Sequence, residues 1–394
     1  MLNKHLLTPA VQSYIAAHLD ADVHKIAMAK TSFPEVTGKE LANQIAARKK
    51  SVRKLPNWFH TPMIYYPVLL SIEQCSSETT AAYKATLVKG DKLIDLTGGF
   101  GVDSYYFSKV SAAVVHCEIN EELSAIAAYN ASLLGQTNTT FQCGDSIEFL
   151  KSTKEQFDSI YIDPARRSSA GKVFLLKDCT PNVVEHLDLL LDKANRILIK
   201  TAPLLDLSAG LKELTQVSEI HIISVKNECK ELIWIIDKGF TGTVKVVCTT
   251  LNTLQKQFIF QPGEETPITN NGALEPGQYL YEPDVALLKS GAFNLIAERF
   301  KLQKFHPQTQ LYTAAEIDPS FPGRIFKIEQ VVSAGAIKKE KDRTGSVIVR
   351  NYPEKAALLV EKYKIKPDDL KFMIFTQSKS AGKIIIKATI IQHY

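Results

Sequence analysis

The chain has 394 residues, of which 45% are hydrophobic and 23% charged, and a formal net charge of +5. This length predicts more than one domain, and the composition excludes disordered, collagen-like and coiled-coil chains. No apolar run reaches the roughly 18 to 20 residues that span a bilayer, and the start lacks the features of a secretion signal, so we expect a cytoplasmic protein without a membrane partner.

The charge changes sign along the chain. Residues 1–90 carry 11 basic against 6 acidic residues, residues 91–240 carry 15 against 21, and residues 241–394 carry 21 against 15. Basic ends around an acidic centre suit a catalytic module flanked by surfaces that attract a polyanion, although a solvated lysine-rich face would have the same composition. The six cysteines form neither a C-x-x-C pair nor a cluster at zinc spacing, so we expect reduced thiols and no metal site.

Residues 1–90 are predicted to form a helical domain. Apolar residues recur at helical spacing over Gln12–Leu19 and Val23–Ala29, and Thr37-Gly38-Lys39-Glu40 resembles a capping box that opens a third helix. That helix ends in a basic run at residues 48–54, and several aromatic residues follow: Trp58, Phe59, Tyr65 and Tyr66. Together they fit single-stranded nucleic acid binding, but cations at a helix end and aromatics in a core explain them as well.

From Asp91 onward, short apolar or β-branched runs alternate with helical stretches, which is typical of a parallel α/β sheet. Seven strands are predicted, at Lys92–Leu96, Ala113–Glu118, Thr139–Cys143, Ser159–Ile162, Arg196–Lys200, Ile220–Val225 and Leu232–Asp237. Only a short polar turn separates the last two strands, so they must form an antiparallel hairpin, because a parallel crossover needs a dozen or more residues. A sheet that ends in an antiparallel hairpin differs from the six-stranded, all-parallel sheet of dehydrogenases, so the pattern argues against a dehydrogenase domain.

Beyond Phe240 the pattern becomes β-rich, through Thr243–Cys248 and Phe258–Phe260, and a loop rich in Pro, Gly and Asn follows. A compact segment, Tyr279–Pro322, contains a predicted helix at Ala286–Phe300. In the basic C-terminal part, a helix is predicted at Pro353–Tyr363, and strands are predicted at Ser346–Arg350, Phe372–Thr376 and Lys383–Ile391. We therefore predict four domains: residues 1–90, 91–240, 241–322 and 323–394.

Three successive strand ends carry acidic residues. Asp95 ends the first strand, before a tight turn and the start of a helix, at Thr97, Gly98, Gly99, Phe100, Gly101 and Asp103. Glycines permit positive φ and close approach of the backbone to a ligand. Glu118 at the second strand end can accept hydrogen bonds from both ribose hydroxyls, and Asp145 after the third can take an adenine amino group. Each acid alone could be an ordinary cap, but in this order they suit a nucleoside.

The first turn also separates two nucleoside cofactors. NAD needs room for a pyrophosphate, usually with G-x-G-x-x-G. Asp95 and Asp103 beside this turn would repel an anion and attract a sulfonium cation that carries an ammonium group. S-adenosylmethionine is therefore the predicted cofactor.

The loop after the fourth strand reads Asp163-Pro164-Ala165-Arg166-Arg167 and would face the methyl donor. Asp163 can accept a hydrogen bond from an amine, and Pro164 fixes the turn. Arg166 and Arg167 can clamp a phosphate or carboxylate, or simply pair with nearby acids. We predict these four residues as the catalytic set.

These motifs resemble those of class I S-adenosylmethionine-dependent methyltransferases over about residues 91–240. More narrowly, the chain resembles a bacterial methyltransferase family with a helical N-terminal region, a ferredoxin-like segment and a C-terminal THUMP-like domain. This match rests on Asp163–Arg167, on residues 281–284 with 287–289, and on the basic tail. The resemblance implies a Rossmann-like seven-stranded sheet with α+β C-terminal domains. It also implies an RNA substrate, tRNA or rRNA, because THUMP domains bind RNA in enzymes that modify these RNAs.

The loop departs from the family patterns at Ala165 and Arg166. Base-amino methyltransferases carry D/N-P-P-Y/F/W, whose aromatic residue stacks on a flipped base. The C5-uracil enzymes carry D-P-P-R and a cysteine nucleophile after the fifth strand, where this chain has Lys200-Thr201-Ala202-Pro203, and Cys179 is a poor substitute. We expect transfer to a nitrogen that Asp163 orients. A small-molecule methyltransferase and a non-catalytic S-adenosylmethionine- or RNA-binding protein are the alternatives.

Overall fold

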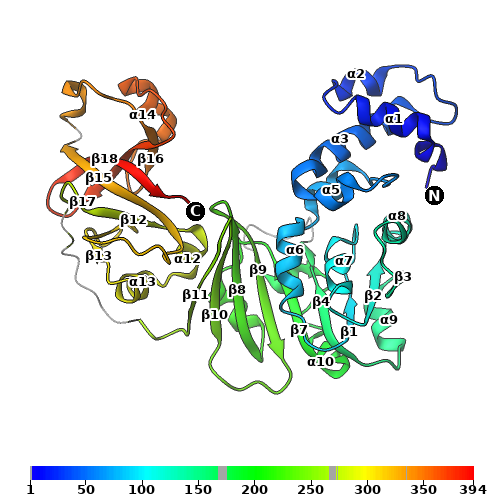
Figure 1. Ribbon diagram of the computed structural model, residues 1–394. Coiled ribbons are helices and arrows are strands. Elements are labelled where there is room, and N and C mark those ends of the chain that lie inside the picture. Colours follow the sequence, from blue (N-terminus) through cyan, green and yellow to red (C-terminus); the bar gives the residue numbers. More distant parts are fainter. Residues whose placement is uncertain (1, 167–174, 266–271, 273, 334) are drawn as a thin grey trace. The chain divides into compact units, whose positions relative to one another are not determined.

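The computed structural model describes residues 2–166, 175–265, 272, 274–333 and 335–394 (Figure 1). The chain divides into two compact units: Met1–Ser218 with Ile233–Gly242, and Glu219–Leu232 with Thr243–Tyr394. Over the described ranges, no helix is both long and apolar enough to cross a membrane. The same ranges contain no cluster of His, Cys, Asp and Glu that suits a metal ion.

The N-terminal region is helical, as predicted. Its elements are η1 (Lys4–Leu7), α1 (Pro9–Ala17), α2 (Val23–Met28), α3 (Gly38–Lys54), α4 (Pro56–His60), α5 (Leu69–Gln74) and α6 (Glu78–Ala85). The capping box is present, because Thr37 Oγ1 accepts from the Glu40 amide and Glu40 accepts from the Thr37 amide. Trp58, Tyr65 and Tyr66 are buried in the core of this region. Of the two interpretations of the aromatics, the structure therefore supports core packing for these three.

The first unit contains the predicted parallel sheet. Its strands run in the order β9-β7-β4-β1-β2-β3, and the neighbours from β7 to β3 pair in parallel. The strands are β1 (Lys92–Asp95), β2 (Ala113–Glu118), β3 (Thr139–Cys143), β4 (Phe157–Ile162), β7 (Ala194–Thr201) and β9 (Glu228–Asp237). Of β9, the part from Ile233 onward belongs to this unit. Helices α6 and α7 lie beside the strands (Figure 1). The helices between strands are α7 (Val102–Ser108), α8 (Glu121–Leu133), α9 (Ser146–Ser152), α10 (Leu187–Lys193) and α11 (Leu207–Glu213).

The predicted hairpin is present, but the strand series does not end there. β8 (Val217–Val225) and β9 are neighbours joined by Lys226 and Asn227, both at positive φ, as in a two-residue hairpin turn. β10 (Lys245–Leu251) pairs in parallel with β8, and β11 (Gln255–Phe260) pairs antiparallel with β10. The predicted count of seven strands is therefore too low. The sequence predicts β-rich segments where β10 and β11 lie, but it does not predict their pairing with β8, because pairing across a long connection leaves no local signal.

The second unit contains a further sheet in the order β13-β14-β12-β15-β18-β17-β16. Its elements are β12 (Tyr279–Pro283), α12 (Val285–Ser290), α13 (Phe293–Arg299), β13 (Gln303–Lys304), β14 (Tyr312–Ala314), β15 (Gly323–Ser333), η3 (Ile337–Lys339), β16 (Ser346–Val349), α14 (Ala356–Tyr363), β17 (Lys371–Ser378) and β18 (Gly382–Gln392). The single helix predicted at Ala286–Phe300 is wrong, because Gly291 adopts φ 77° and ends α12. β12 pairs with β15, so this sheet crosses the predicted boundary at residue 322.

The segment Tyr281–Asp284 has a structural role in the second unit. Glu282 is buried and forms ion pairs with Arg324 and Arg350, each at 2.5 Å. Asp284 caps α12 by accepting from the Ala286 amide, and it also accepts from the Ser224 hydroxyl on β8. This motif, on which part of the family resemblance rests, therefore joins β8, β12 and β15.

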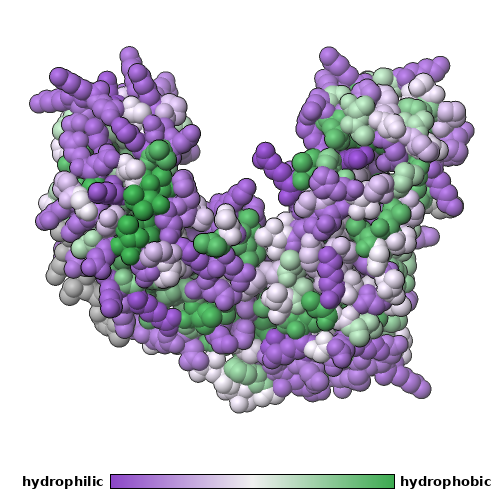
Figure 2. All heavy atoms as spheres, in the orientation of Figure 1, coloured by the Kyte–Doolittle hydropathy of each residue, from purple (hydrophilic) through white to green (hydrophobic). Residues whose placement is uncertain are grey.

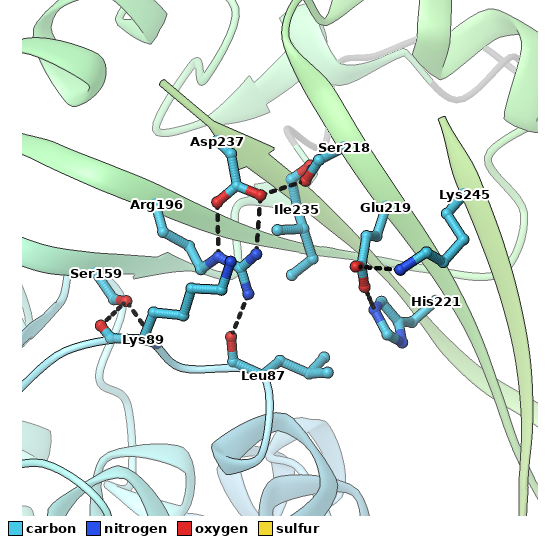
Figure 3. A network of polar contacts seen from close by, with 10 residues as sticks. All are labelled: Leu87, Lys89, Ser159, Arg196, Ser218, Glu219, His221, Ile235, Asp237 and Lys245. Carbon is cyan, nitrogen blue, oxygen red and sulfur yellow. Dashed lines mark hydrogen bonds and ion pairs between the residues drawn. The ribbon is translucent and has the colours of Figure 1, made fainter. Parts of the chain in front are cut away.

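A half-buried ion pair joins the neighbouring strands β7 and β9 of the first sheet (Figure 3). Arg196 on β7 donates two hydrogen bonds to the Asp237 carboxylate on β9, at 2.7 and 2.8 Å, and a third to the Leu87 carbonyl at 2.9 Å. Ser218 donates to the same carboxylate at 2.6 Å. Burial opposes ionisation of Asp237, but the hydrogen bonds from Arg196 and Ser218 outweigh it and lower its pKa.

We expect Arg196→Met to lower the free energy of unfolding by about 2 kcal/mol, because it leaves the half-buried Asp237 carboxylate without its charged partner. Chemical denaturation measures the change. Lys49→Met removes an exposed pair with Asp20 and serves as the control, which should leave the unfolding midpoint almost unchanged. Equal losses in the two variants would contradict the assignment.

Candidate active site

A cavity of about 650 Å³ lies in the first unit, where β1, β2, β3 and β4 end. This is the edge of a parallel sheet at which α/β proteins bind ligands, and the volume lies within the range of cofactor sites. Of the predicted site residues, those that line the cavity are Thr97, Gly98, Gly99, Phe100, Asp103, Glu118, Asp145 and Asp163.

The glycine turn is fixed by close contacts. A Cβ atom at Gly98 would lie 2.3 Å from the buried His116 ring, so no larger residue fits. Gly99 adopts φ 56° and donates its amide to Glu118 at 2.9 Å, and Gly101 adopts φ 86° as it begins α7. The turn therefore needs glycine for its conformation and for its contact with β2.

Asp95 does not line the cavity. Its carboxylate is fully buried and accepts from the Thr97 amide at 3.0 Å and from the Ser104 hydroxyl at 2.6 Å. Burial raises the pKa of Asp95 to about 7. In the structure Asp95 therefore stabilises the glycine turn through Thr97 and Ser104, on the side away from the cavity.

Asp103 lines the cavity, but its charge is compensated. Lys84, which is completely buried, lies 3.0 Å from it, and Ser76 and Tyr161 donate hydrogen bonds to its other oxygen at 2.7 and 3.0 Å. Burial opposes ionisation of Asp103, yet the Lys84 and Lys200 ammonium groups outweigh it and lower the pKa. Asp95 and Asp103 therefore repel an anion in the cavity less than the sequence suggested, because Asp95 is buried and Asp103 is paired with Lys84.

Other acids supply the negative charge of the cavity. Glu118 is held by the amides of Gly99 and Asn120, at 2.9 and 2.7 Å. Asp145 caps α9 through Oδ1 alone, which leaves Oδ2 outside this cap. Glu185 also lines the wall, and so does Glu148, whose charge is compensated by an ion pair at 2.8 Å with Lys151, another residue of the wall. An acidic cavity suits a cationic ligand.

Asp163 is placed at the cavity by two neighbouring strands. Its amide donates to Thr97 Oγ1 at 2.7 Å, and its carboxylate forms an ion pair with Lys200. Pro164 is buried next to it. Arg166 belongs to a short strand, β5 (Ala165–Arg166), which pairs with β6 (Cys179–Thr180). Arg167 lies outside the described residues.

Sequence reasoning missed two walls of the cavity. One comes from the N-terminal helices and contains Ser71, Gln74, Cys75 and Ser76, and the other contains Thr180, Pro181, Asn182, Glu185 and His186. Ile119 also lines the cavity although the residue is 74% exposed. Only Ile119, an apolar residue directly after the acid of β2, carried a local signal; the two walls depend on long-range packing.

The comparisons with known proteins agree with this architecture. Residues 279–322 match the model of a ferredoxin-like domain. A crystal structure of a candidate methyltransferase from Porphyromonas gingivalis W83 superposes with a TM-score of 0.86, at 29% identity and over the full length of both chains. The N-terminal helices, the Rossmann-like sheet and the ferredoxin-like C-terminal domain therefore belong to a methyltransferase fold.

Two curated proteins are also similar in sequence. An uncharacterized S-adenosylmethionine-dependent methyltransferase of Mycobacterium tuberculosis is 22% identical over 303 residues, covering 76% of this chain and 78% of the relative. The 23S rRNA (uracil(1939)-C(5))-methyltransferase of Photobacterium angustum is 33% identical over 99 residues, covering 24% of this chain and 45% of that protein.

We expect Asp95→Asn to change how stability depends on pH. Folding raises the pKa of Asp95 from its ordinary 3.8 to about 7, so its contribution to stability is complete below about pH 4 and is lost as the pH rises through 7. Asparagine resembles the protonated acid. The unfolding temperature of the variant minus that of the wild type should therefore increase between pH 4 and pH 8.

The exposed Asp91→Asn serves as the matched control for this measurement. Its difference from the wild type should stay flat over the same range. A flat difference for Asp95→Asn as well would show that the buried carboxyl does not titrate as described.

Proposed function

We propose that this chain, an S-adenosylmethionine-dependent methyltransferase, transfers the methyl group to a base nitrogen of structured RNA, rRNA or tRNA. The observation that carries the proposal is the acidic cavity at the strand ends, where Glu118, Asp145 and Asp163 lie in the order that a nucleoside donor and an acceptor require. An RNA substrate of this kind would make the cytoplasm the place of the reaction.

The donor would lie along the ends of β1, β2 and β3. Glu118 would accept from the ribose hydroxyls, and Asp145 Oδ2 would accept from the adenine amino group. Ile119 and the buried Ile147 line the cavity beside these two acids and would pack on the faces of the adenine ring. Contact with the ring would explain why a large apolar side chain is exposed at residue 119.

The cysteines argue against methylation of a uracil carbon, which needs a thiolate nucleophile. Cys75 and Cys117 line the cavity, but burial raises the pKa of Cys75 to about 11 and that of Cys117 to about 12, so both are neutral thiols. Cys179 is completely buried. The similarity to a uracil-C5 enzyme therefore supports an RNA substrate, whereas the thiols support a nitrogen acceptor.

The basic C-terminal part offers a place for the RNA backbone. Arg324–Tyr394 carries 15 basic against 7 acidic residues. Within it, a cleft of about 460 Å³ is lined by Lys341, Arg343, Lys364 and Lys366, and Asp342 is the acid in its wall. Backbone bonds between the two segments hold these cations together, because Lys366 donates to the Arg343 carbonyl at 2.9 Å. Hydrophilic residues cover most of the face in Figure 2, including the end around α14.

Glu118→Ala should lose S-adenosylmethionine binding, whereas Asp163→Ala should keep binding and lose turnover, because the first change removes the ribose contact and the second the acceptor contact. Calorimetry measures the affinity, and transfer of a labelled methyl group to total RNA from a strain without the protein measures turnover. Mass spectrometry of nucleosides from that strain should show one missing methylated base. Wild-type affinity in Glu118→Ala would refute the ribose contact, and a complete set of RNA methyl groups would favour a small acceptor.

We expect the double variant Lys341→Gln/Lys366→Gln to bind RNA more weakly at low salt and to depend less steeply on salt. Each lost phosphate contact lowers the slope of log affinity against log salt concentration by about 0.7 to 0.9. The control is Lys25→Gln/Lys30→Gln, which removes the same charge from exposed positions of the N-terminal region. An equal effect in both double variants would indicate that net charge alone attracts RNA.

A further inference from the structure

Three neighbouring strands bring Thr97, Asp163 and Lys200 into a row at the cavity edge. The register pairs Asp95 with Tyr161 and Ile162 with Ile199. Residues just beyond these pairs must therefore lie side by side. The contacts agree with this, because Asp163 donates its amide to Thr97 Oγ1 and its carboxylate Oδ2 binds the Lys200 ammonium.

Lys200 is set back from the cavity and Asp163 faces it. The side chain of Lys200 is 15% exposed and that of Asp163 is 35% exposed, and only Asp163 is among the cavity residues. The other polar groups near Lys200 come from different elements: Asp103 on α7, which Lys84 of α6 also contacts, and the neutral Cys75 thiol after α5. The ammonium therefore lies near two carboxylates, Asp163 and Asp103.

We propose that Lys200 is a positioning residue for methyl transfer, which holds the Asp163 carboxylate in the one orientation that receives the acceptor. This rests on the proposed function, in which Asp163 orients a nitrogen. Oδ2 is taken by Lys200 and the backbone is tied to Thr97, so Oδ1 is the oxygen that meets the acceptor N–H.

The chemistry needs orientation here more than a strong base. The nitrogen lone pair forms the bond to the methyl carbon as the sulfur–carbon bond breaks, and the sulfur keeps that electron pair. The N–H proton leaves to solvent once the nitrogen has been methylated. Lys200 binds Oδ2 and so keeps Oδ1 turned to the acceptor throughout, and such alignment is a large source of rate in transfer reactions.

The test compares Lys200→Met, Lys200→Arg and the control Lys212→Met, which changes an exposed lysine of α11. Affinity for S-adenosylmethionine is measured by calorimetry, and the single-turnover rate with labelled donor and undermethylated total RNA. Lys200→Met should keep the affinity within about threefold and slow transfer by about 100-fold, as expected for a misplaced group. Lys200→Arg should recover part of the rate, and Lys212→Met should match the wild type.

A double variant separates positioning from an independent role. If Lys200 acts through Asp163, Lys200→Met adds no further loss to Asp163→Ala. A wild-type rate in Lys200→Met, an additive loss in the double variant, or a loss of donor affinity would each overturn the proposal.

If RNA is not the substrate, the result differs from a failure of the Lys200 proposal. In that case the wild-type protein leaves RNA unlabelled, and the same variants are assayed with a small-molecule extract as acceptor. The proposal for Lys200 predicts the same 100-fold loss there, and an unchanged rate would overturn it.

Discussion

The parallel register of β1, β2, β4 and β7 is the constraint on which the candidate active site depends. It sets Glu118 beside the glycine turn and Asp163 between Thr97 and Lys200. Because side chains alternate between faces, a slip of one residue would turn each of these groups away. The buried apolar residues of the strands, such as Ile94, Ile160 and Leu198, fix the register because each would lose its burial in any other pairing.

The strands were predictable where the signal is local. β2 and β3 have the predicted bounds, and β1, β4 and β7 differ by a few residues at their ends. A short buried strand followed by an acid that caps the next helix, as at Asp145, leaves a clear pattern in the sequence. The pairing of β10 with β8 left none, and the break at Gly291 was hidden within a helical pattern.

Charge was harder to predict than position. The sequence showed that Asp95 and Asp103 flank the glycine turn, but it did not show how the fold uses them. Burial keeps Asp95 behind the turn, and Lys84, from a helix before the sheet, compensates Asp103. Glu118, Asp145 and Asp163 line the cavity. An acid at a strand end therefore indicates where a site lies, whereas its ionisation depends on partners distant in sequence.

The N-terminal helices supply one wall of the cavity and the Lys84 partner of Asp103. This limits which fragments of the enzyme can keep the site and which segments homologues can exchange. A fragment that starts at residue 91 would keep every strand end yet lose Ser76 and Lys84, and Asp103 would then lie in the site without the ammonium group that contacts it. The helical region thus contributes to the candidate active site. Exchange of modules between homologues should keep residues 71–84 together with α7, because Ser76 and Lys84 bind the Asp103 carboxylate of α7.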